Sequence, residues 1–394
     1  MDASQAQRVI ESLRKGIPPD GFVRHFTVGR SKEISELQQR LQDCAGTALL
    51  LKANYGSGKT HLLRFIREEA LAQNYAVSVV TLDSSANVRF NRMDQMLGAI
   101  CRNIEIPGAH GVKGVRYFLE SLKEKIQEEA DGEFWTKLSN GGKWDYSQCL
   151  QSRALFVAVR AWVFDDRDVC LLIEDWLLNP WQYKTERKRL YLTLVENMRR
   201  HFRDPRSAAK FYADEVFTFH TNGYAQSWAT VRDLDCLARA AGMQGLIILF
   251  DEYEDVITNL KNVSHQEAAF WNLFDFFSGQ AFPVKTFYAV TPDFVEKCKN
   301  RLSAKGRWDF DFSRFDALPR FEMSPLDLSH LVDLGKRIAS VHALAYGWNS
   351  QAAVSGSDIS AWMQEATRVQ VQDRTRHAIT LAVKQLDSIC QDDE

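Results

Sequence analysis

"LLLKANYGSGKTHLLRF", residues 49–65, decides which fold this chain can adopt. A short apolar run leads into a glycine-rich turn, and the turn leads into residues with helical spacing. The turn ends in Gly-Lys-Thr, as a Walker A phosphate loop does. The motif is usually written with a glycine at its first position, where this chain has Ala53. Alanine is incompatible there only if the backbone needs a positive φ, and the alternatives to a working loop are a chance match and an inactive loop.

The rest of the loop retains what phosphate binding requires. Gly56 and Gly58 let the backbone approach a phosphate without a Cβ, Lys59 supplies the charge for the β- and γ-phosphates, and Thr60 supplies a magnesium ligand. A helix that starts near His61 would point its positive end at the same anion. We predict nucleotide contacts at Asn54, Tyr55, Gly56, Ser57, Gly58, Lys59, Thr60 and His61.

Short apolar runs alternate with helical segments, a pattern typical of a parallel sheet covered by helices on both faces. We predict strands at 47–53, 75–83, 245–252 and 284–291, with a short fifth strand at 320–323. Residues 90–240 show mostly helical spacing and no strong strand. The expected class is therefore an α/β P-loop NTPase with a large helical insertion and a C-terminal helical lid.

The same patterns suggest three units. Residues 1–100 and 240–323 would form the nucleotide-binding core, 101–239 the helical insertion and 324–394 the lid. Ser324 and Pro325 have the residue types of a helix N-cap and first helical position, so we predict that the lid begins there.

Composition excludes several classes of protein. The chain has 394 residues, of which 45% are hydrophobic and 25% charged, and a net charge of −2, so any nucleic-acid contact must be a local patch. Seven cysteines form no CxxC pair, which argues against zinc ribbons and indicates reduced, mostly buried thiols. The N-terminus lacks the apolar region of a signal peptide and no apolar run is long enough to cross a bilayer, so we expect a cytoplasmic protein without a membrane partner.

The acidic end of the third apolar run, "LIILFDEYED" at 246–255, has the second set of residues that ATP hydrolysis needs. Asp251 would position Mg²⁺ and Glu252 would orient and deprotonate the attacking water. An acid directly after the aspartate favours attack by water over phosphoryl transfer to a small molecule. The alternative is a strand that ends in a solvated acidic turn, and Tyr253, Glu254 and Asp255 are interpreted as helix-start residues.

Three segments together resemble the ATP-binding proteins of BREX phage-defence systems. They are "IESLRKGIPPDGFVRHFTVGRSKEISEL" (10–37), "YGSGKTHLLRFIREEAL" (55–71) and "LIILFDEYE" (246–254). Those are P-loop proteins akin to the origin-recognition branch of AAA+ ATPases. The resemblance covers the first 100 residues and 245–300, and elsewhere only the layout agrees. It implies that Val28, Gly29 and Arg30 lie near the adenine, although Ser31 replaces the usual acid.

The resemblance also implies further catalytic groups. Thr291 would be the polar residue that AAA+ proteins place at the end of the strand after the acidic one. Arg374 or Arg376, at the start of the last helix, would contact the γ-phosphate from the lid. Arg314 and Arg320 are candidates for an arginine supplied by a neighbouring subunit, which implies a homo-oligomer that either is permanent or forms only with nucleotide bound. A strand-end hydrogen bond and solvated arginines are the alternatives.

The insertion has two features of its own. Basic residues concentrate at 183–192 and 199–206, where they would contact the backbone of duplex DNA or form a solvated helix face. The insertion also contains tryptophans typical of a helical core, some of which could serve a partner surface. They are Trp135, Trp144, Trp162, Trp176 and Trp181.

These observations predict an ATPase that uses ATP and Mg²⁺. It would drive assembly or remodelling in a phage-defence complex acting on DNA, together with a helicase, methyltransferase or nuclease. The alternatives are a slow nucleotide-dependent switch or scaffold and a direct DNA-remodelling motor.

Overall fold

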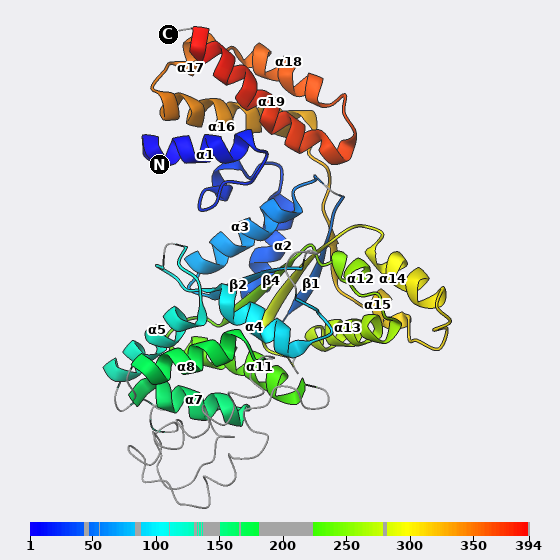
Figure 1. Ribbon diagram of the computed structural model, residues 1–394. Helices are drawn as coiled ribbons and strands as arrows, with labels where there is room; N and C mark the ends of the chain where they lie inside the picture. Colours follow the sequence, from blue (N-terminus) through cyan, green and yellow to red (C-terminus); the bar gives the residue numbers. More distant parts are fainter. Residues whose placement is uncertain are drawn as a thin grey trace, which may run out of the picture.

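The computed structural model describes most of the chain. The described residues are 1–42, 47–54, 56–82, 88–109, 111–129, 132, 134, 136, 150–164, 167–180, 224–278 and 282–392. Figure 1 shows three tiers: the C-terminal helices at the top, a sheet flanked by helices in the middle, and a second group of helices at the bottom.

Within this part of the chain, six strands form one mostly parallel sheet in the order β3-β2-β4-β5-β1-β6. The strands are β1 (Ala48–Lys52), β2 (Ala76–Thr81), β3 (Ile104–Glu105), β4 (Leu246–Asp251), β5 (Lys285–Val290) and β6 (Arg320–Glu322). All pairs are parallel except β2 with β3. The five predicted strands are all present. The sequence analysis missed β3, because two residues are too few to show strand periodicity.

Alternation along the strands explains why helices cover both faces of the sheet. Leu49 and Leu51 of β1 pack with helices α2 (Ser31–Gln42) and α3 (Lys59–Ala72) on one face. Leu50, between them, belongs to the cluster on the other face. That face is covered by α4 (Met93–Asn103), α11 (Ala225–Ala240), α13 (Val263–Phe276) and α14 (Phe294–Ser303). The short helices η1 (Val23–Phe26), α12 (Asp255–Asn259) and α15 (Ser313–Asp316) connect these layers.

The helical insertion shares the core of the second face. Its described helices are α5 (Val115–Glu128), α7 (Arg153–Phe164), α8 (Arg167–Leu178) and nearly all of α11. Trp162 and Trp176 are fully buried there, which confirms the core interpretation for these two tryptophans. The other three tryptophans of the insertion, and the basic segments within 183–206, lie outside the described residues.

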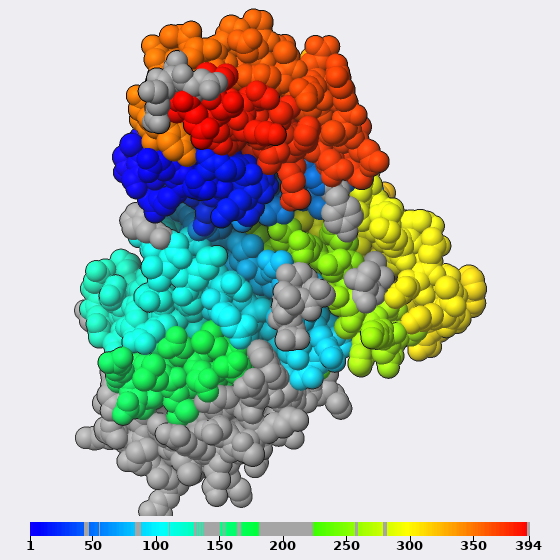
Figure 2. Space-filling model, turned by 45° about the horizontal axis from the view of Figure 1, so that its top comes forward, coloured from blue at the N-terminus to red at the C-terminus, as the bar shows by residue number. Residues whose placement is uncertain are grey.

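The N-terminal helix α1 (Ala3–Arg14) packs on the C-terminal helices, whose bounds are α16 (Leu328–Tyr346), α17 (Ser350–Ala353), α18 (Gly356–Ala366) and α19 (Val371–Asp392). Val9, Ile10 and Leu13 share one apolar cluster with α16, α18 and α19. Figure 2 shows α1 in dark blue lying directly beneath the orange and red helices. The three-unit division stays a prediction, but this packing groups α1 with residues 324–394.

The predicted helix N-cap at Ser324, with Pro325 as the first helical residue, is wrong. Helix α16 begins at Leu328, and Asp327 is its N-cap, with its carboxylate accepting a hydrogen bond from His330 N. The chain before it is still tied to the sheet, because Met323 N donates to Lys52 O. Asp327, three positions after Ser324, is also a favoured capping residue type, and it is the N-cap of α16.

The five described cysteines are free thiols. Cys101, Cys170 and Cys298 are buried, and burial raises the pKa of the Cys101 thiol to about 12. Burial also raises the pKa of the Cys298 thiol, so the thiols of Cys101 and Cys298 are protonated at neutral pH. Among the described helices, none is both long enough and apolar enough to cross a membrane.

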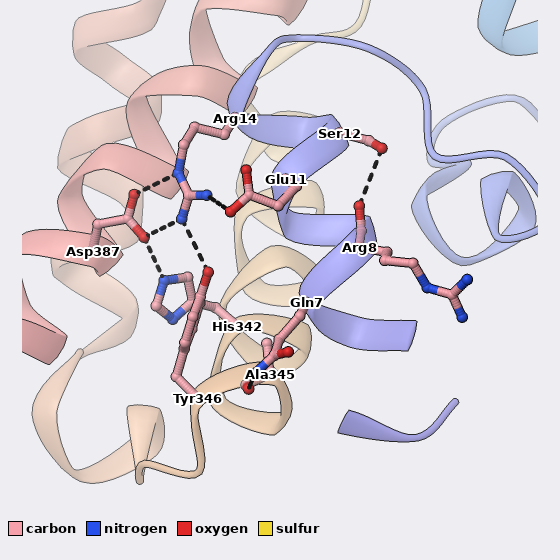
Figure 3. A network of polar contacts seen from close by, with 9 residues as sticks. All are labelled: Gln7, Arg8, Glu11, Ser12, Arg14, His342, Ala345, Tyr346 and Asp387. Atoms are coloured by element: carbon pink, nitrogen blue, oxygen red, sulfur yellow. Dashed lines mark hydrogen bonds and ion pairs between the residues drawn. The ribbon is translucent and has the colours of Figure 1, made fainter. Parts of the chain in front are cut away.

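A polar cluster ties α1 to the helices that it covers (Figure 3). Arg14 donates from Nε and Nη2 to both carboxylate oxygens of Asp387, at 3.0 and 2.8 Å, and from Nη2 to the Tyr346 hydroxyl at 3.1 Å. Trp348 Nε1 donates to His342 Nδ1 at 3.0 Å, so the other ring nitrogen of His342 carries the proton and donates to Asp387 at 3.0 Å. A charge-assisted fork of this kind fixes orientation as well as distance.

Burial alone would raise the pKa of Asp387, but the bonds from Arg14 and His342 outweigh it and hold the pKa below its usual value. Burial lowers the pKa of His342, whose bond to Asp387 acts in the opposite direction. The stable combination at neutral pH is thus a charged Asp387 with a neutral His342.

We expect Asp387→Asn to lower the free energy of unfolding by about 1 kcal/mol, as for other partly exposed ion pairs. A carboxyl with a lowered folded-state pKa contributes its stability above the unfolded pKa, near 3.9, and loses it as the pH falls through the folded value. Denaturant titrations from pH 7 to 3 should show a constant difference between variant and wild type above about pH 5 that shrinks at lower pH. Glu11→Gln, at an exposed partner of Arg14, is the control and should change stability by less than about 0.5 kcal/mol. A difference independent of pH would contradict the assignment.

Candidate nucleotide-binding site

A cavity of about 200 Å³ lies where the carboxyl ends of β1 and β4 meet the C-terminal helices. Its floor is the β1–α3 loop with residues 56–62, and its acidic side is the end of β4. The remaining walls come from segments 13–30, 326–334 and 375–379. The pocket therefore joins the sheet, the N-terminal segment and the lid.

The loop after β1 has the shape that phosphate binding requires. Gly56 and Gly58 have φ of +73° and +95°, values that favour glycine, and Gly58 is the N-cap of α3. The non-glycine residues with positive φ in the described chain are Asn74, Tyr224 and Glu252, so Ala53 lies outside the left-handed region. Ala53 is 2% exposed and donates to Val290 O at 3.0 Å. Its methyl group is part of the core beneath the loop.

The predicted contacts of this loop meet at the cavity with few exceptions. The cavity is lined by Gly56, Ser57, Gly58, Lys59, Thr60 and His61. Tyr55 lies outside the described residues, and Asn54 accepts hydrogen bonds from Ser57 through its backbone oxygen. The N-terminal end of α3 therefore faces the cavity, where it favours an anion.

Lys59 and Glu254 form a buried ion pair. Lys59 Nζ donates to Glu254 Oε1 at 2.7 Å, and the two side chains are 9% and 6% exposed. Glu254 precedes helix α12, as its position in the sequence predicts, but its contact with Lys59 is not predicted. The sequence contains a signal for this contact, because "DEYED" has a third acid two residues beyond Glu252. A buried lysine side chain is stable only with a counter-charge nearby, and this acid can supply it.

Asp251 and Thr60 lie next to each other in the wall of the cavity. Burial raises the pKa of Asp251, and this is partly offset by hydrogen bonds from the Thr60 hydroxyl and Glu252 N and by the charge of Lys59. A hydroxyl and a carboxylate are ligands that Mg²⁺ accepts alongside phosphate oxygens and water. No group of three His, Cys, Asp or Glu side chains within the described ranges is arranged to hold a metal by itself. The residues present thus fit a magnesium ion that arrives with phosphates, and that ion stays a prediction.

Glu252 is exposed at the cavity edge with a φ of +55°. A non-glycine residue in this conformation costs of order 1 kcal/mol, and such backbone strain clusters at functional sites. The turn is held by Asp255 N, which donates to Glu252 O at 3.0 Å. The strained backbone turns the side chain of Glu252 away from the core, where Tyr253 is fully buried.

The predicted adenine-side residues lie at the same cavity, with one unexpected role. Val28 and Arg30 line it, and Gly29 has a φ of +62° with His330 close against it. Arg30 donates to Glu33 Oε1 at 2.8 Å, to Ser57 O at 3.0 Å and to Ser324 O at 2.5 Å. The guanidinium of Arg30 therefore links the loop after β1 to Ser324, which precedes helix α16.

Most of the remaining pocket wall is apolar, which suits a planar base, and Thr375 and Arg376 are its polar residues. Its apolar residues are Leu13, Pro18, Pro19, Phe26, Val28, Leu326, Leu334 and Ile379. His61 also lines the cavity, and its Nε2 lies 2.9 Å from Thr27 Oγ1. Burial, followed by the charges of Arg30 and Arg64, lowers the pKa of His61 to about 4. The imidazole is therefore neutral at physiological pH.

The lid distinguishes between the two candidate arginines. Arg376 lines the cavity and packs against Gly16. Arg374 does not line it, and its Nη2 donates to Thr367 O at 3.3 Å within the lid. The first turn of α19 also touches the phosphate loop, since a Cβ on Gly56 would lie 1.6 Å from Gln372 O.

The other candidates lie apart from the cavity. Thr291 follows β5 at the same edge of the sheet and is 3% exposed, but it does not line the pocket. The hydrogen bond from Lys297 does most to lower the pKa of Asp293, and the Thr291 hydroxyl, which lies near that carboxyl, also helps to lower it. Among the described residues, the Thr291 hydroxyl makes no hydrogen bond of standard geometry. Arg314 stacks over Trp271 at 4.5 Å, and Arg320 is exposed at the start of β6.

The chain matches a protein-family model. The model of the family described as BREX system ATP-binding protein BrxC/D matches residues 1–138 and 224–394. No curated protein and no solved structure matches the chain. The matched residues include the phosphate loop, the acidic strand end and all of the C-terminal helices.

Two opposite substitutions test the geometry of the loop. We expect Ala53→Gly to leave ATP affinity within about twofold and to cost about 1 kcal/mol of stability, because it adds backbone freedom and removes a buried methyl group. We expect Gly56→Ala to weaken ATP binding by at least about tenfold, because its Cβ meets Gln372 and its φ is positive. Calorimetric titration with ATP and thermal unfolding provide the measurements. Tighter binding by Ala53→Gly would mean that Ala53 is a defect.

Proposed function

This chain belongs to the BREX system ATP-binding protein BrxC/D family, and on that premise we propose that it binds ATP with Mg²⁺ in the cavity and hydrolyses it. The observation that carries the proposal is the meeting of Lys59, the Thr60–Asp251 pair and Glu252 around one pocket. These residues come from segments far apart in the sequence. A chance phosphate-loop motif gives no reason for the acids to lie beside it.

Each residue has a distinct role in the proposal. The loop amides and Lys59 bind the phosphates, while Thr60 and Asp251 hold the magnesium ion, which neutralises charge on the phosphates when bound. Glu252, exposed at the cavity edge, orients the attacking water and accepts its proton. Thr291 would assist hydrolysis as a polar side chain at the edge of the sheet from which the phosphate loop also extends. The apolar walls would hold the base.

The lid would supply the last charge. Arg376 is favoured over Arg374 because it lines the pocket, whereas Arg374 bonds within the lid. Arg314 and Arg320 are exposed and distant from this pocket, as a residue offered to a neighbouring subunit would be. We therefore retain them as candidates for an intersubunit arginine in an AAA+-like homo-oligomer.

In the cell the cycle would drive assembly or remodelling in a phage-defence complex that acts on DNA, with a helicase, methyltransferase or nuclease as partner. A second candidate is a slow nucleotide-dependent switch. The Lys59–Glu254 pair favours it, because Glu254 occupies the lysine that a phosphate would contact. The first turn of α19 also lies close against Gly56, so the position of the lid and the occupancy of the loop would be coupled. Direct remodelling of DNA would depend on the basic segments within 183–206.

Two substitutions separate binding from hydrolysis. We expect Lys59→Ala to weaken ATP binding by at least about tenfold, and Glu252→Gln to keep binding but lower turnover by about a hundredfold or more. Calorimetry and phosphate release, with and without duplex DNA, provide the two measurements, and light scattering follows oligomer size. Normal ATP binding by Lys59→Ala would overturn the site. Binding without turnover in any condition would support the switch, and several-fold stimulation by DNA would support the motor.

The lid arginines form a matched pair. We expect Arg376→Ala to lower turnover by at least about tenfold, because it removes a charge at the developing γ-phosphate, while Arg374→Ala changes it by less than about threefold. Single-turnover phosphate release at saturating ATP is the measurement. Equal losses in both variants, or a loss confined to Arg374→Ala, would contradict the assignment.

A further inference from the structure

We propose that Glu254 is an internal competitor of the nucleotide: its carboxylate takes the place of phosphate at Lys59, so that the preference of the pocket for ATP and ADP over AMP is weaker than it would be without Glu254. This inference rests on the proposed nucleotide site and adds a specificity-determining residue to it. Glu254 would bind no substrate. It would set how strongly a phosphate must compete for the lysine.

The contact has the chemistry of a phosphate contact. A carboxylate oxygen lies 2.7 Å from Lys59 Nζ, the distance of a charge-assisted hydrogen bond. In a phosphate loop this ammonium group binds β- and γ-phosphate oxygens. Glu254 and Lys59 both line the cavity beside Gly56 and Gly58. An incoming β-phosphate must therefore displace Glu254 before Lys59 can bind it.

The position of Glu254 is not explained by the helix that it precedes. It is the N-cap of α12, yet its side chain makes no capping bond, and its backbone is in the right-handed helical region with φ −56° and ψ −26°. Its second oxygen, Oε2, is buried without a hydrogen-bond partner in the described part of the chain. A buried carboxylate oxygen without a partner is costly. The ion pair with Lys59 is thus the interaction that holds this side chain in the pocket.

Removal of the competing charge should strengthen binding. Glu254→Gln keeps the shape of the side chain but removes the carboxylate that is hydrogen-bonded to the buried ammonium of Lys59, so a phosphate no longer competes with that charge. ATP and ADP both carry a β-phosphate and gain from this change. AMP has no phosphate that reaches the lysine, so its affinity does not depend on whether Glu254 is displaced.

The experiment is calorimetric titration of the full chain with ATP, ADP and AMP. We expect Glu254→Gln to bind ATP and ADP about tenfold more tightly than wild type, with AMP unchanged within about twofold. Glu254→Asp keeps the charge on a shorter side chain and should tighten ATP and ADP binding by about threefold. Asp255→Asn is the matched control, because it removes a neighbouring charge that does not line the cavity, and its ATP affinity should equal that of wild type.

Three outcomes overturn the inference. They are unchanged or weaker ATP binding in Glu254→Gln, equal tightening for AMP, and the same gain in Asp255→Asn, which would indicate general electrostatics. If Glu254→Gln does not fold, judged by circular dichroism, Glu254→Asp decides alone by the same ATP-to-AMP comparison. Lys59→Ala separates this inference from the proposed function. If Lys59→Ala binds ATP normally, the nucleotide site itself is wrong; if it loses ATP while Glu254→Gln matches wild type, only the competitor is wrong.

Discussion

The parallel pairing of β5 between β1 and β4 is the constraint on which the candidate site depends. Leu49 of β1 and Leu249 of β4 both pair with Phe287, so the two strands that flank β5 are in register and end at the same edge of the sheet. The phosphate loop follows one strand and the acids follow the other. Because parallel strands place their carboxyl ends together, a shift in this register would separate Lys59 from Asp251.

The N-terminal thirty residues connect this edge to the lid. Helix α1 is held on α16 and α19 by an apolar face and by the Arg14–Asp387 fork. The chain then passes through Gly16 and two prolines that line the cavity and reaches Arg30, which bonds to both the phosphate loop and Ser324. A change in the phosphate loop therefore has a continuous set of contacts through which to move the lid. This arrangement is suited to a protein whose nucleotide state is read by partners.

Much of the local structure was predictable. The strand-loop-helix around Lys59 and the acidic strand at Asp251 follow from short apolar runs, glycines and helical spacing, all of which act over a few residues. The helix start at Ser324 was predicted wrongly, since residue preference alone does not show that Met323 is still bonded to β1. Strand β3 was missed because its two residues owe their conformation to the neighbouring β2.

By itself the sequence determined that the chain has a glycine-rich loop between a strand and a helix, an acidic strand end and an α/β core, because backbone preference and hydrophobic periodicity are local properties. Only the tertiary structure decided that Glu254 pairs with Lys59, that Arg376 and not Arg374 lines the pocket, and that α1 joins the lid. Residues two positions apart on one turn have the same local preferences. Which of them meets a distant partner depends on how the helix is rotated and packed, and that follows from contacts across the whole chain.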